Sequence, residues 1–522
     1  MNRITIRIDN LARVPIRDLS ESLALKLNKR FTYLTPASNN RFKGKLVARC
    51  VASISGGWFC VPRGAFLQLQ HELSNHFDHF DYDVSGVFSV SSKTTPLHHL
   101  NVQLRDYQIK AIEACMEKRQ GILQMPCGAG KTTTGAAALL HSGEPGVVIV
   151  HTKDIQRQWV NTINRLSPGT VVKQTIDCRL RKNQIVVAMI QTLSRNPLQA
   201  TALLDTAGAV ITDECHHVPA ATWETIINKC KSRFRWGLTA TPERSDGLGF
   251  MQNLLVGPTI FRISTTQLIE MGFLKNPYII PVATGWSPGL EDYNLTSNCV
   301  RCDRKRKIKK LDSFRLNGFV CTKCRFKNKN TPLNTGTLNY AAAVTSACRN
   351  PDRLHLAVRL ISSALRDERC VLVLIPRVNV ANALNEILND HGMPSVVVTG
   401  DLPKNERVRR LEEVKCGRKH VLVATQLADE GLDLPRLDCA INLSSGKNAG
   451  RARQRVGRTL RMEGKNPIIF EFVDSGPFLR QWAKRRESYV LEYGQTSVAS
   501  IEPLSINYAI AAARSKNEPD IF

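Results

Sequence analysis

The chain has 522 residues, more than one hydrophobic core normally serves, so we expect three or four domains. Its composition, 43% hydrophobic and 22% charged residues, is that of a soluble globular protein. Lys and Arg (72) exceed Asp and Glu (45), which gives a net charge of +27. This excess favours a polyanionic partner, nucleic acid above all, over charge that serves only solubility.

Targeting and membrane signals are not found in the sequence. Residues 1–7 alternate like a strand and lack the apolar core of a signal peptide, and no apolar run has membrane-spanning length. We therefore expect an intracellular protein, in the cytoplasm, nucleoid or nucleus, that is neither secreted nor membrane-bound. Fifteen cysteines in such a chain do not indicate a disulfide framework. Eleven are scattered singly, and four are paired.

Residues 1–98 are predicted to form a small accessory domain. They contain short β-like runs at 45–50 and 57–61 but no catalytic constellation. The basic segment 26–45 could contact nucleic acid, and a solvated face is the alternative.

From residue 99 the pattern changes to short apolar runs between helix-length segments, which is typical of a covered parallel sheet. A first α/β domain is predicted over 99–275 and a second over 346–478. A polar linker with an insertion, 276–345, separates them, and 479–522 form a C-terminal extension that could be a tail or a partner helix. The predicted strands are 121–125, 147–150, 185–188 and 209–212 in the first domain, and 370–375, 395–398, 420–424, 439–442 and 467–470 in the second.

A glycine-rich segment follows the first of these strands and opens a helix. Glycines let backbone N–H groups close around phosphate oxygens, and the helix N-terminus adds positive partial charge. Lys131 would reach the β- and γ-phosphates and Thr132 would ligate magnesium. The strict motif has glycine where Met125 stands. The predicted nucleotide contacts are Gly128, Ala129, Gly130, Lys131, Thr132 and Thr133.

Asp213 and Glu214 end an apolar strand. The first carboxylate can hold a magnesium shell and the second can polarise an attacking water. An ordinary acidic pair at a strand end is the alternative, but the order of loop, helix, strand and acidic pair favours function. Metal binding by Cys215, His216 and His217 is disfavoured, because adjacent residues at a strand end rarely converge on one ion.

A basic segment lies at 454–461. Gln454, Gly457, Arg458 and Arg461 have the spacing of one helix face, and a solvated basic helix is the alternative.

The paired cysteines, Cys299 with Cys302 and Cys321 with Cys324, are separated by eighteen residues. Two such pairs predict a four-thiolate zinc ribbon with a structural ion, which replaces a core that so short a segment cannot build. A redox role would suit one pair better than two.

Residues 299–330 carry twelve Lys or Arg and two Asp, a net of +10. We expect this insertion to bind phosphates. Phe314, Phe319 and Phe326 could stack on bases or form the ribbon's own small core.

Taken in order, these segments resemble the motifs of the superfamily 2 helicases over about 100–475. The further matching segments are 104–108, 149–152 with 158–159, 190–193, 213–216 (the DExH box), 238–242, and 423–426 with 430–435. Residues 239–244 and 454–461 are most similar to the XPB-like DNA helicases, with phage branch-migrating helicases second. Arg244, Ser245 and Asp246 depart from the Arg-Glu-Asp triplet of the XPB group.

The resemblance implies two tandem RecA-like domains that use ATP and Mg²⁺, and it implies roles for particular residues. Gln108 would read adenine, and Gly431 and Asp433 would lie near the ribose. Arg458 and Arg461 would be arginine fingers. Hydrolysis would be coupled to movement by His216, Thr239, Thr241 and Gln454.

The predicted function is an ATP-dependent helicase or translocase on nucleic acid, with DNA favoured over RNA. The alternatives are a double-strand DNA translocase without strand separation and an RNA helicase. A scaffold that uses ATP only as a switch is disfavoured by the intact Lys131, Asp213, Glu214 and Arg458. Protein partners, polarity and pathway are not predicted.

Overall fold

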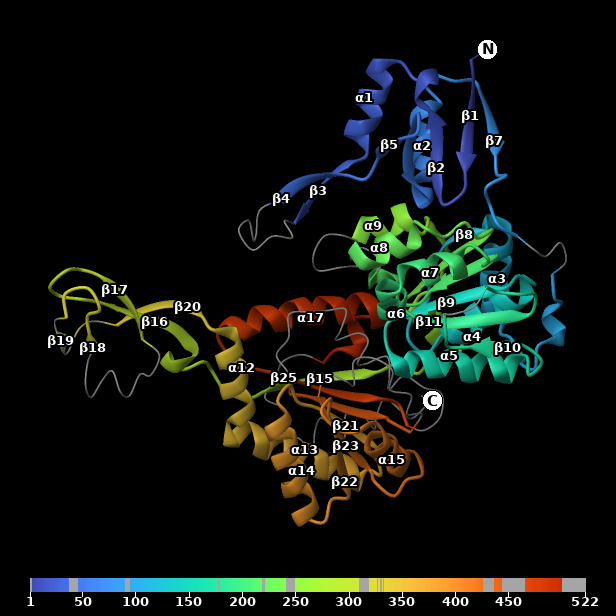
Figure 1. Ribbon diagram of the computed structural model, residues 1–522. Coiled ribbons are helices and arrows are strands. Elements are labelled where there is room, and N and C mark those ends of the chain that lie inside the picture. Colours follow the sequence, from blue (N-terminus) through green and yellow to red (C-terminus); the bar gives the residue numbers. More distant parts are fainter. Residues whose placement is uncertain are drawn as a thin grey trace. The chain divides into compact units, whose positions relative to one another are not determined.

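A computed structural model describes most of the chain (Figure 1). The described residues are 2–36, 46–89, 94–176, 179–217, 221–240, 249–308, 319–325, 327–328, 331, 333–425, 436–443 and 465–499. The chain divides into two compact units, residues 1–267 and 268–522.

The first unit begins with a five-stranded sheet in the order β5-β6-β2-β1-β7. The elements of this region are β1 (Arg3–Ile8), β2 (Leu11–Pro15), α1 (Glu21–Arg30), β3 (Thr32–Pro36), β4 (Leu46–Cys50), β5 (Ser53–Ser55), β6 (Trp58–Pro62), α2 (Phe66–Leu73) and β7 (His79–Asp83). In β1 the side chains of Ile4 and Ile6 are buried while Arg3 and Thr5 are exposed. This alternation buries one face of the strand, as residues 1–7 predicted.

A seven-stranded parallel sheet follows in the same unit, in the order β10-β11-β9-β12-β13-β8-β14. Its elements are α3 (Asp106–Lys118), β8 (Gln120–Gln124), α4 (Lys131–His141), β9 (Gly146–Val150), α5 (Lys153–Leu166), β10 (Val171–Lys173), β11 (Gln184–Met189), α6 (Ile190–Arg195), α7 (Pro197–Leu204), β12 (Ala209–Thr212), α8 (Ala221–Ile227), β13 (Phe234–Thr239), α9 (Gly249–Leu255) and β14 (Thr259–Arg262). β9 and β12 are buried along their whole length, because helices cover both faces of the sheet. The four strands predicted here are confirmed as β8, β9, β11 and β12.

The accessory sheet is joined to the parallel sheet by two buried arginines. Arg63 donates from Nη1 to the carbonyl oxygens of Ser232 (2.6 Å) and Asp9 (3.2 Å). Arg235 of β13 donates from Nη2 to the carbonyl of Asn10, at 3.4 Å, and from Nη1 to the carbonyl of Leu255 in its own domain, at 3.1 Å. Burial lowers the pKa of Arg63 to about 9. Residues from both sheets share one hydrophobic core.

The second unit contains a six-stranded parallel sheet in the order β15-β25-β24-β21-β23-β22. Its elements are β15 (Tyr278–Ala283), α12 (Tyr340–Arg349), α13 (Pro351–Arg366), β21 (Val371–Leu374), α14 (Val378–Asp390), β22 (Ser395–Val398), α15 (Lys404–Lys415), β23 (Val421–Ala424), β24 (Cys439–Asn442), β25 (Ile468–Val473) and α17 (Pro477–Tyr493); α10 (Thr265–Glu270) crosses from the first unit into the second along the chain. All five predicted strands are confirmed, and with the first sheet they establish two tandem parallel α/β domains.

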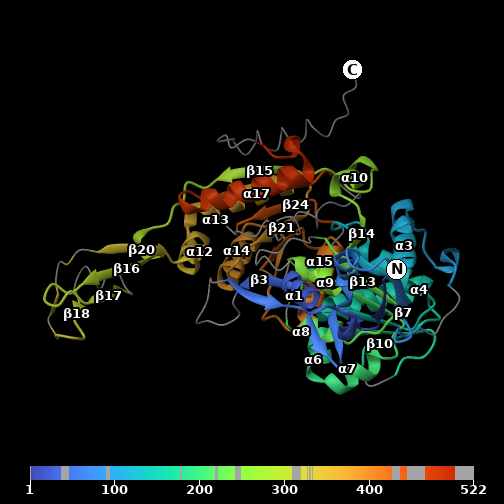
Figure 2. The same ribbon diagram turned by 90° about the horizontal axis from the view of Figure 1, so that it is seen from above.

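Two elements of this unit lie in regions for which we predicted a linker and an extension. β15 falls within 276–345, yet it pairs with β25 along its full length. α17 crosses residue 478 and runs beside β15 (Figure 2). Its Arg485 and Tyr489 contact the buried Glu471 of β25, at 3.1 and 2.7 Å. Both elements therefore contribute to the second α/β domain.

The insertion between β15 and α12 forms a small module. β16 (Tyr293–Asn298), β17 (Lys305–Ile308) and β20 (Asn334–Leu338) form an antiparallel sheet in the order β17-β16-β20. β18 (Phe319–Val320) pairs with β19 (Lys327–Asn328) beside the cysteines. Over the described ranges, no helix is both long enough and apolar enough to cross a bilayer.

Candidate functional site

The glycine-rich loop connects β8 to α4. Gly128 and Gly130 have φ angles of 81° and 75°, in the left-handed region that favours glycine. Gly130 also caps α4, which begins at Lys131. A Cβ atom on Gly130 would lie 2.6 Å from Nε2 of Gln108, so no larger residue fits without displacing that side chain. The loop conformation and the helix start are those of a phosphate cradle.

Two side chains of α3 form hydrogen bonds with the glycine-rich loop. The Tyr107 hydroxyl and the Gln108 amide both donate to the carbonyl of Ala129, at 3.0 and 3.4 Å. Burial raises the pKa of Tyr107, so its hydroxyl stays protonated and can donate. Oε1 of Gln108 accepts from the backbone N–H of Arg105 at 3.0 Å. Gln108 thus contacts the glycine-rich loop itself. Its contact with adenine stays a prediction.

Three strands bring the remaining groups to the same edge of the sheet. β12, β13 and β8 are parallel neighbours, so their carboxyl ends lie side by side. Asp213 follows β12, Thr239 ends β13, and the loop follows β8. The backbone N–H of Met125 donates to the carbonyl of Thr239 at 3.0 Å, which joins the loop to β13.

Asp213 is buried, and two donors orient its carboxylate. The indole Nε1–H of Trp159 donates to Oδ2 at 2.7 Å, and the backbone N–H of Glu214 donates to Oδ1 at 2.9 Å. Burial and the neighbouring charge of Glu214 raise the pKa of Asp213. Burial also acts to raise the pKa of Glu214, but the hydrogen bond from His216 and the charge of Lys131 outweigh it and lower that pKa. The two carboxyl groups therefore have different acidities.

His216 connects the acidic pair to β13. Its Nδ1 lies 3.3 Å from Oε2 of Glu214 and 3.2 Å from Oγ1 of the buried Thr239. A shift of Thr239 would therefore displace the His216 ring and, with it, the contact of that ring with Glu214. Glu214 itself has a positive φ of 48°, which is uncommon for a residue other than glycine.

The groups at this edge suit a magnesium nucleotide. Thr132 lies half-buried in the first turn of α4, and Asp213 supplies carboxylate oxygens. Hydroxyl and carboxylate oxygens are ligands that Mg²⁺ prefers. Lys131 lies over the loop, where its Nζ donates to the carbonyl of Pro126 at 3.3 Å. Thr133 follows in the same turn, also half-buried.

Other predicted site residues lie outside the described residues: Thr241, Gly431, Asp433, Gln454, Arg458 and Arg461. Among the described ones, Trp159 belongs to segment 158–159, which resembles part of a helicase motif. In the structure its side chain is fully buried and bonds to Asp213. Its orienting role depends on a contact across 54 residues, for which the sequence carries no signal.

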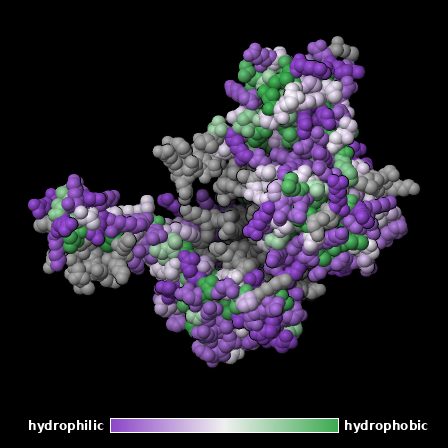
Figure 3. All heavy atoms as spheres, in the orientation of Figure 1, coloured by the Kyte–Doolittle hydropathy of each residue, from purple (hydrophilic) through white to green (hydrophobic). Residues whose placement is uncertain are grey.

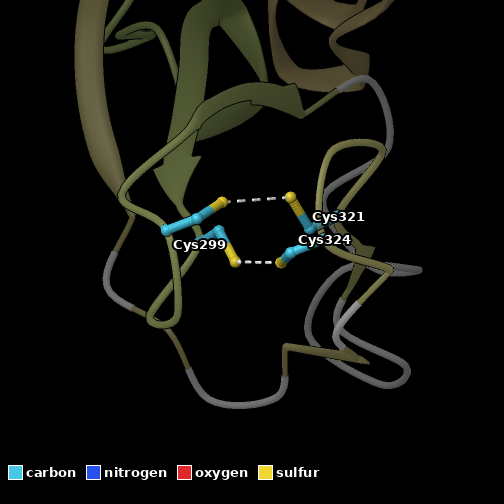
Figure 4. A group of neighbouring side chains, drawn as sticks. Cys299, Cys321 and Cys324 are labelled. Atoms are coloured by element: carbon cyan, nitrogen blue, oxygen red, sulfur yellow. Dashed lines mark hydrogen bonds between the residues drawn. The ribbon is translucent and has the colours of Figure 1, made fainter.

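The second predicted site is confirmed as a cluster. The sulfur atoms of Cys299, Cys302, Cys321 and Cys324 all lie within 4.8 Å of one another. The sulfur atoms of Cys299 and Cys324 are 3.5 Å apart, and those of Cys302 and Cys321 are 3.6 Å apart. Figure 4 shows the side chains of this group pointing toward one another. A disulfide would need about 2.05 Å. Four sulfurs at about 2.3 Å from one tetrahedral ion would lie about 3.8 Å apart, so the spacing is consistent with a zinc site.

Backbone and amide groups prepare these thiols for metal binding. Burial acts to raise the pKa of Cys299, but the N–H groups of Arg301 and Cys302 and the Asn328 amide lower it to about 6. The Asn328 amide donates to the Cys299 sulfur at 3.5 Å, and its oxygen accepts from the N–H of Val300 at 2.9 Å. Donors of this kind stabilise the thiolate that a metal binds.

Two protein-family models match the chain. Residues 101–244 match "Type III restriction enzyme, res subunit", and residues 352–463 match "Helicase conserved C-terminal domain". The first match contains the loop, the acidic pair and Thr239, and the second lies in the second α/β domain.

Relatives extend over both domains. The chain is 25% identical over 427 residues to the DNA 3'-5' translocase XPB2 of Sulfurisphaera tokodaii, covering 76% of this chain and 87% of that protein. It is 24% identical to the DNA 3'-5' helicase XPB of Mycobacterium tuberculosis, covering 79% and 68%. It is 25% identical to the putative helicase 22 of a Sulfolobus islandicus filamentous virus, covering 75% and 68%. These matches support a superfamily 2 helicase of the XPB-like kind.

Among solved structures, a leucine-to-valine variant of Saccharomyces cerevisiae Dbp5 bound to RNA and ADP BeF3 is similar in fold. It aligns with a TM-score of 0.51 at 13% identity and covers 80% of this chain and 98% of that one. The two parallel sheets are therefore like those of RecA-fold helicases.

Proposed function

We propose that this protein is an ATP-dependent DNA helicase or translocase. The observation that carries the proposal is the meeting of the Lys131 loop, the Asp213–Glu214 pair and Thr239 at one edge of the first parallel sheet. The XPB-like relatives are named as DNA 3'-5' translocase or helicase, which favours DNA over RNA.

In the proposed chemistry each residue at this edge has one task. The loop N–H groups and Lys131 bind the phosphates, and Thr132 with Asp213 holds magnesium. Bound Mg²⁺ neutralises charge on the phosphates when ATP is present. Glu214, with its lowered pKa, is ionised at neutral pH and can accept a proton from the attacking water. Gln108 contacts the adenine, next to the loop that it supports.

Coupling of hydrolysis to movement is assigned to the contact of His216 with Thr239 and Glu214. A change at Glu214 during hydrolysis would move His216 and then the end of β13. Sequence resemblance adds Thr241 and Gln454 to this set, and it assigns Arg458 and Arg461 to charge stabilisation on the transferring phosphoryl group. It also places Gly431 and Asp433 near the ribose.

The four cysteines are proposed to hold a structural zinc ion. Their sulfur spacing and the lowered pKa of Cys299 support this, and a set of four thiolates leaves no open position for catalysis. The finer family assignment is also a proposal. Asp213 to His216 supports the DExH class, and phage branch-migrating helicases are the second candidate after the XPB group.

Measurement of ATP hydrolysis with single-stranded, duplex and forked DNA and with RNA tests the proposal. We expect DNA to raise the rate more than RNA does, and Glu214→Gln to remove the stimulated rate. A rate that no polynucleotide raises, or that Glu214→Gln leaves intact, would contradict it. A strand-displacement assay then distinguishes unwinding from the alternative, translocation on duplex DNA without strand separation.

A further inference from the structure

We propose that one face of the three-stranded sheet in the cysteine module binds the sugar-phosphate backbone of DNA. This face, which we call the lysine face, consists of Thr296, Asn298, Lys305, Lys307 and Asn334. The inference rests on the proposed function and adds a place outside both parallel sheets at which the substrate is held.

The strand register places these five residues on one side of the sheet. Lys305 lies directly opposite Asn298, and Lys307 opposite Thr296, across the β16–β17 pair. Asn334 lies opposite Thr296 across the β16–β20 pair. Directly opposite residues of antiparallel strands project to the same face, and residues two apart along a strand do so too.

The other side of the sheet faces the module's interior. Leu295 and Ser297 of β16 are buried, and the Ser297 hydroxyl bonds to that of Thr331 at 2.7 Å. Arg306, which alternates with the two lysines, donates to the carbonyl of Val320 in β18. The packing contacts of the module are therefore made by the face opposite to the lysine face.

Three of the five residues of the lysine face, Lys305, Lys307 and Asn334, are exposed, whereas Thr296 and Asn298 are half-buried. Lys305 and Lys307 are exposed, and neither forms an ion pair with any residue for which coordinates are described. The nearby Asp303 accepts a hydrogen bond from the Asn298 amide at 2.9 Å. Hydrophilic side chains cover much of the visible surface of this module (Figure 3).

Charge across the whole insertion points to an anion. Residues 299–330 carry a net charge of +10, from which a zinc ion held by four thiolates removes only two units. Exposed cations crowded in this way repel one another, and a polyanion relieves the repulsion. The exposed basic residues of the described part are Arg301, Arg304, Lys305, Arg306, Lys307, Lys323, Arg325 and Lys327.

The chemistry of the lysine face fits a phosphate backbone. Lys305 and Lys307 are about 7 Å apart along an extended strand. Phosphates of one DNA strand follow one another every 3.4 Å along the helix axis, so the two ammonium groups would meet about two of them. The amide and hydroxyl groups of Asn298, Thr296 and Asn334 can donate further hydrogen bonds to phosphate and sugar. Contacts of this kind position DNA without reading its sequence.

The test compares full-length variants by fluorescence anisotropy with a labelled duplex at several salt concentrations. Each lost phosphate contact lowers the slope of log K against log salt by about 0.9. We expect Lys305→Gln/Lys307→Gln to lower the slope by about 2 and to weaken binding on the order of tenfold or more at 0.1 M salt. Lys305→Arg/Lys307→Arg should keep the wild-type slope, because both charges remain.

Arg359→Gln/Arg366→Gln is the matched control, because it removes two exposed charges from α13 in the same unit. We expect it to bind DNA with the wild-type slope. The inference is overturned if the control and the Gln variant lose equal slope, or if the Gln variant loses none. In the second case the lysines would serve only to block pairing at the edge strand β17.

The ATPase assay separates this inference from the proposed function. We expect the Gln variant to need on the order of tenfold more DNA for half-maximal stimulation, with the same maximal rate. If no polynucleotide stimulates the wild-type chain, the proposed function fails. If DNA stimulates the wild type and the Gln variant equally at every DNA concentration, only the lysine face is refuted.

Discussion

The nucleotide site and the cysteine cluster are held in place by different means. Lys131, Asp213 and Thr239 extend from a seven-stranded sheet whose central strands are buried along their length. Among the described residues of the cysteine module, the hydrophobic cluster around the thiols is very small, with Cys299 and Cys321 as its buried members. The partly buried residues packed on them are Cys302, Ile308, Cys324 and Leu333. In the first site a large buried core positions the chemical groups. In the second site the cysteines themselves form the core that positions them.

This difference predicts opposite consequences for substitutions. A functional group at the edge of the large sheet can be removed without loss of the core. In the proposed zinc site, removal of one thiolate removes the interaction that replaces a core. The following predictions measure activity, metal content and stability to separate these two cases.

The largest effect is expected for Cys299→Ser. Loss of one thiolate should abolish zinc binding and unfold the module, because the apparent free energy of structural zinc sites is about 10–16 kcal/mol. Zinc content by atomic absorption should fall from about one ion per chain to almost none. Limited proteolysis should then cleave within 293–338, while the main thermal transition shifts little.

Cys416→Ser is the control, because Cys416 is an exposed free cysteine on the second parallel domain. It should retain zinc and resist proteolysis like the wild type. Retention of zinc by Cys299→Ser, or an equal loss in both variants, would mean that the four thiols do not form one metal site.

Lys131→Ala should lower ATPase activity by about 10²–10³-fold, as expected for loss of one group that stabilises charge on the phosphates. The melting temperature should change little, because the one described hydrogen bond of its ammonium goes to the carbonyl of Pro126. Steady-state kinetics and thermal unfolding of the same preparation measure both.

Lys182→Ala is the matched control. Lys182 is exposed and precedes β11, so it lies at the sheet edge opposite to the carboxyl ends of the strands. It should leave hydrolysis unchanged. A large fall in melting temperature for Lys131→Ala would show that the loop contributes to the fold, against the contrast drawn above.

Asn328→Ala tests support of the metal ligands. It removes the amide that donates to the Cys299 sulfur and accepts from Val300. We expect zinc affinity to fall about 10–100-fold, measured by competition with a chelator. Asn294→Ala, which removes an amide bound to Thr337 in the same module, should leave the affinity unchanged. Equal losses would point to general destabilisation of the module.

The smallest effect is expected for Trp159→Phe. It removes the donor to Asp213 Oδ2 and should lower kcat about tenfold, the lower end of the about 1.5–3 kcal/mol that a hydrogen bond to a charged group contributes. Trp236→Phe removes another buried indole donor, to the carbonyl of Cys115. The two variants should lose similar stability, but Trp236→Phe should keep its ATPase rate. Equal rates for both would show that Trp159 only packs.

Much of the fold was predictable because local patterns specify local structure. Short apolar runs of strand length became the buried strands of both sheets, and the glycines before Lys131 became a left-handed loop. β13 escaped prediction because Arg235 and Gly237 interrupt its apolar pattern, and only the sheet shows that Arg235 bonds inward to carbonyl groups. β15 lay in a predicted linker because its edge position depends on a partner about 190 residues away.

The same division applies to the sites. Residue types and spacing by themselves identified the glycine-rich loop, the acidic pair and the two cysteine pairs that form the cluster, because each motif is contained in a few consecutive residues. Only the tertiary structure decided that Trp159 orients Asp213, that His216 lies between Glu214 and Thr239, and that Lys305 and Lys307 share a face with Asn298 and Thr296. These arrangements come from strand order and register. Strand order and register depend on the burial of many side chains from different segments, so they cannot be read from any one segment of the sequence.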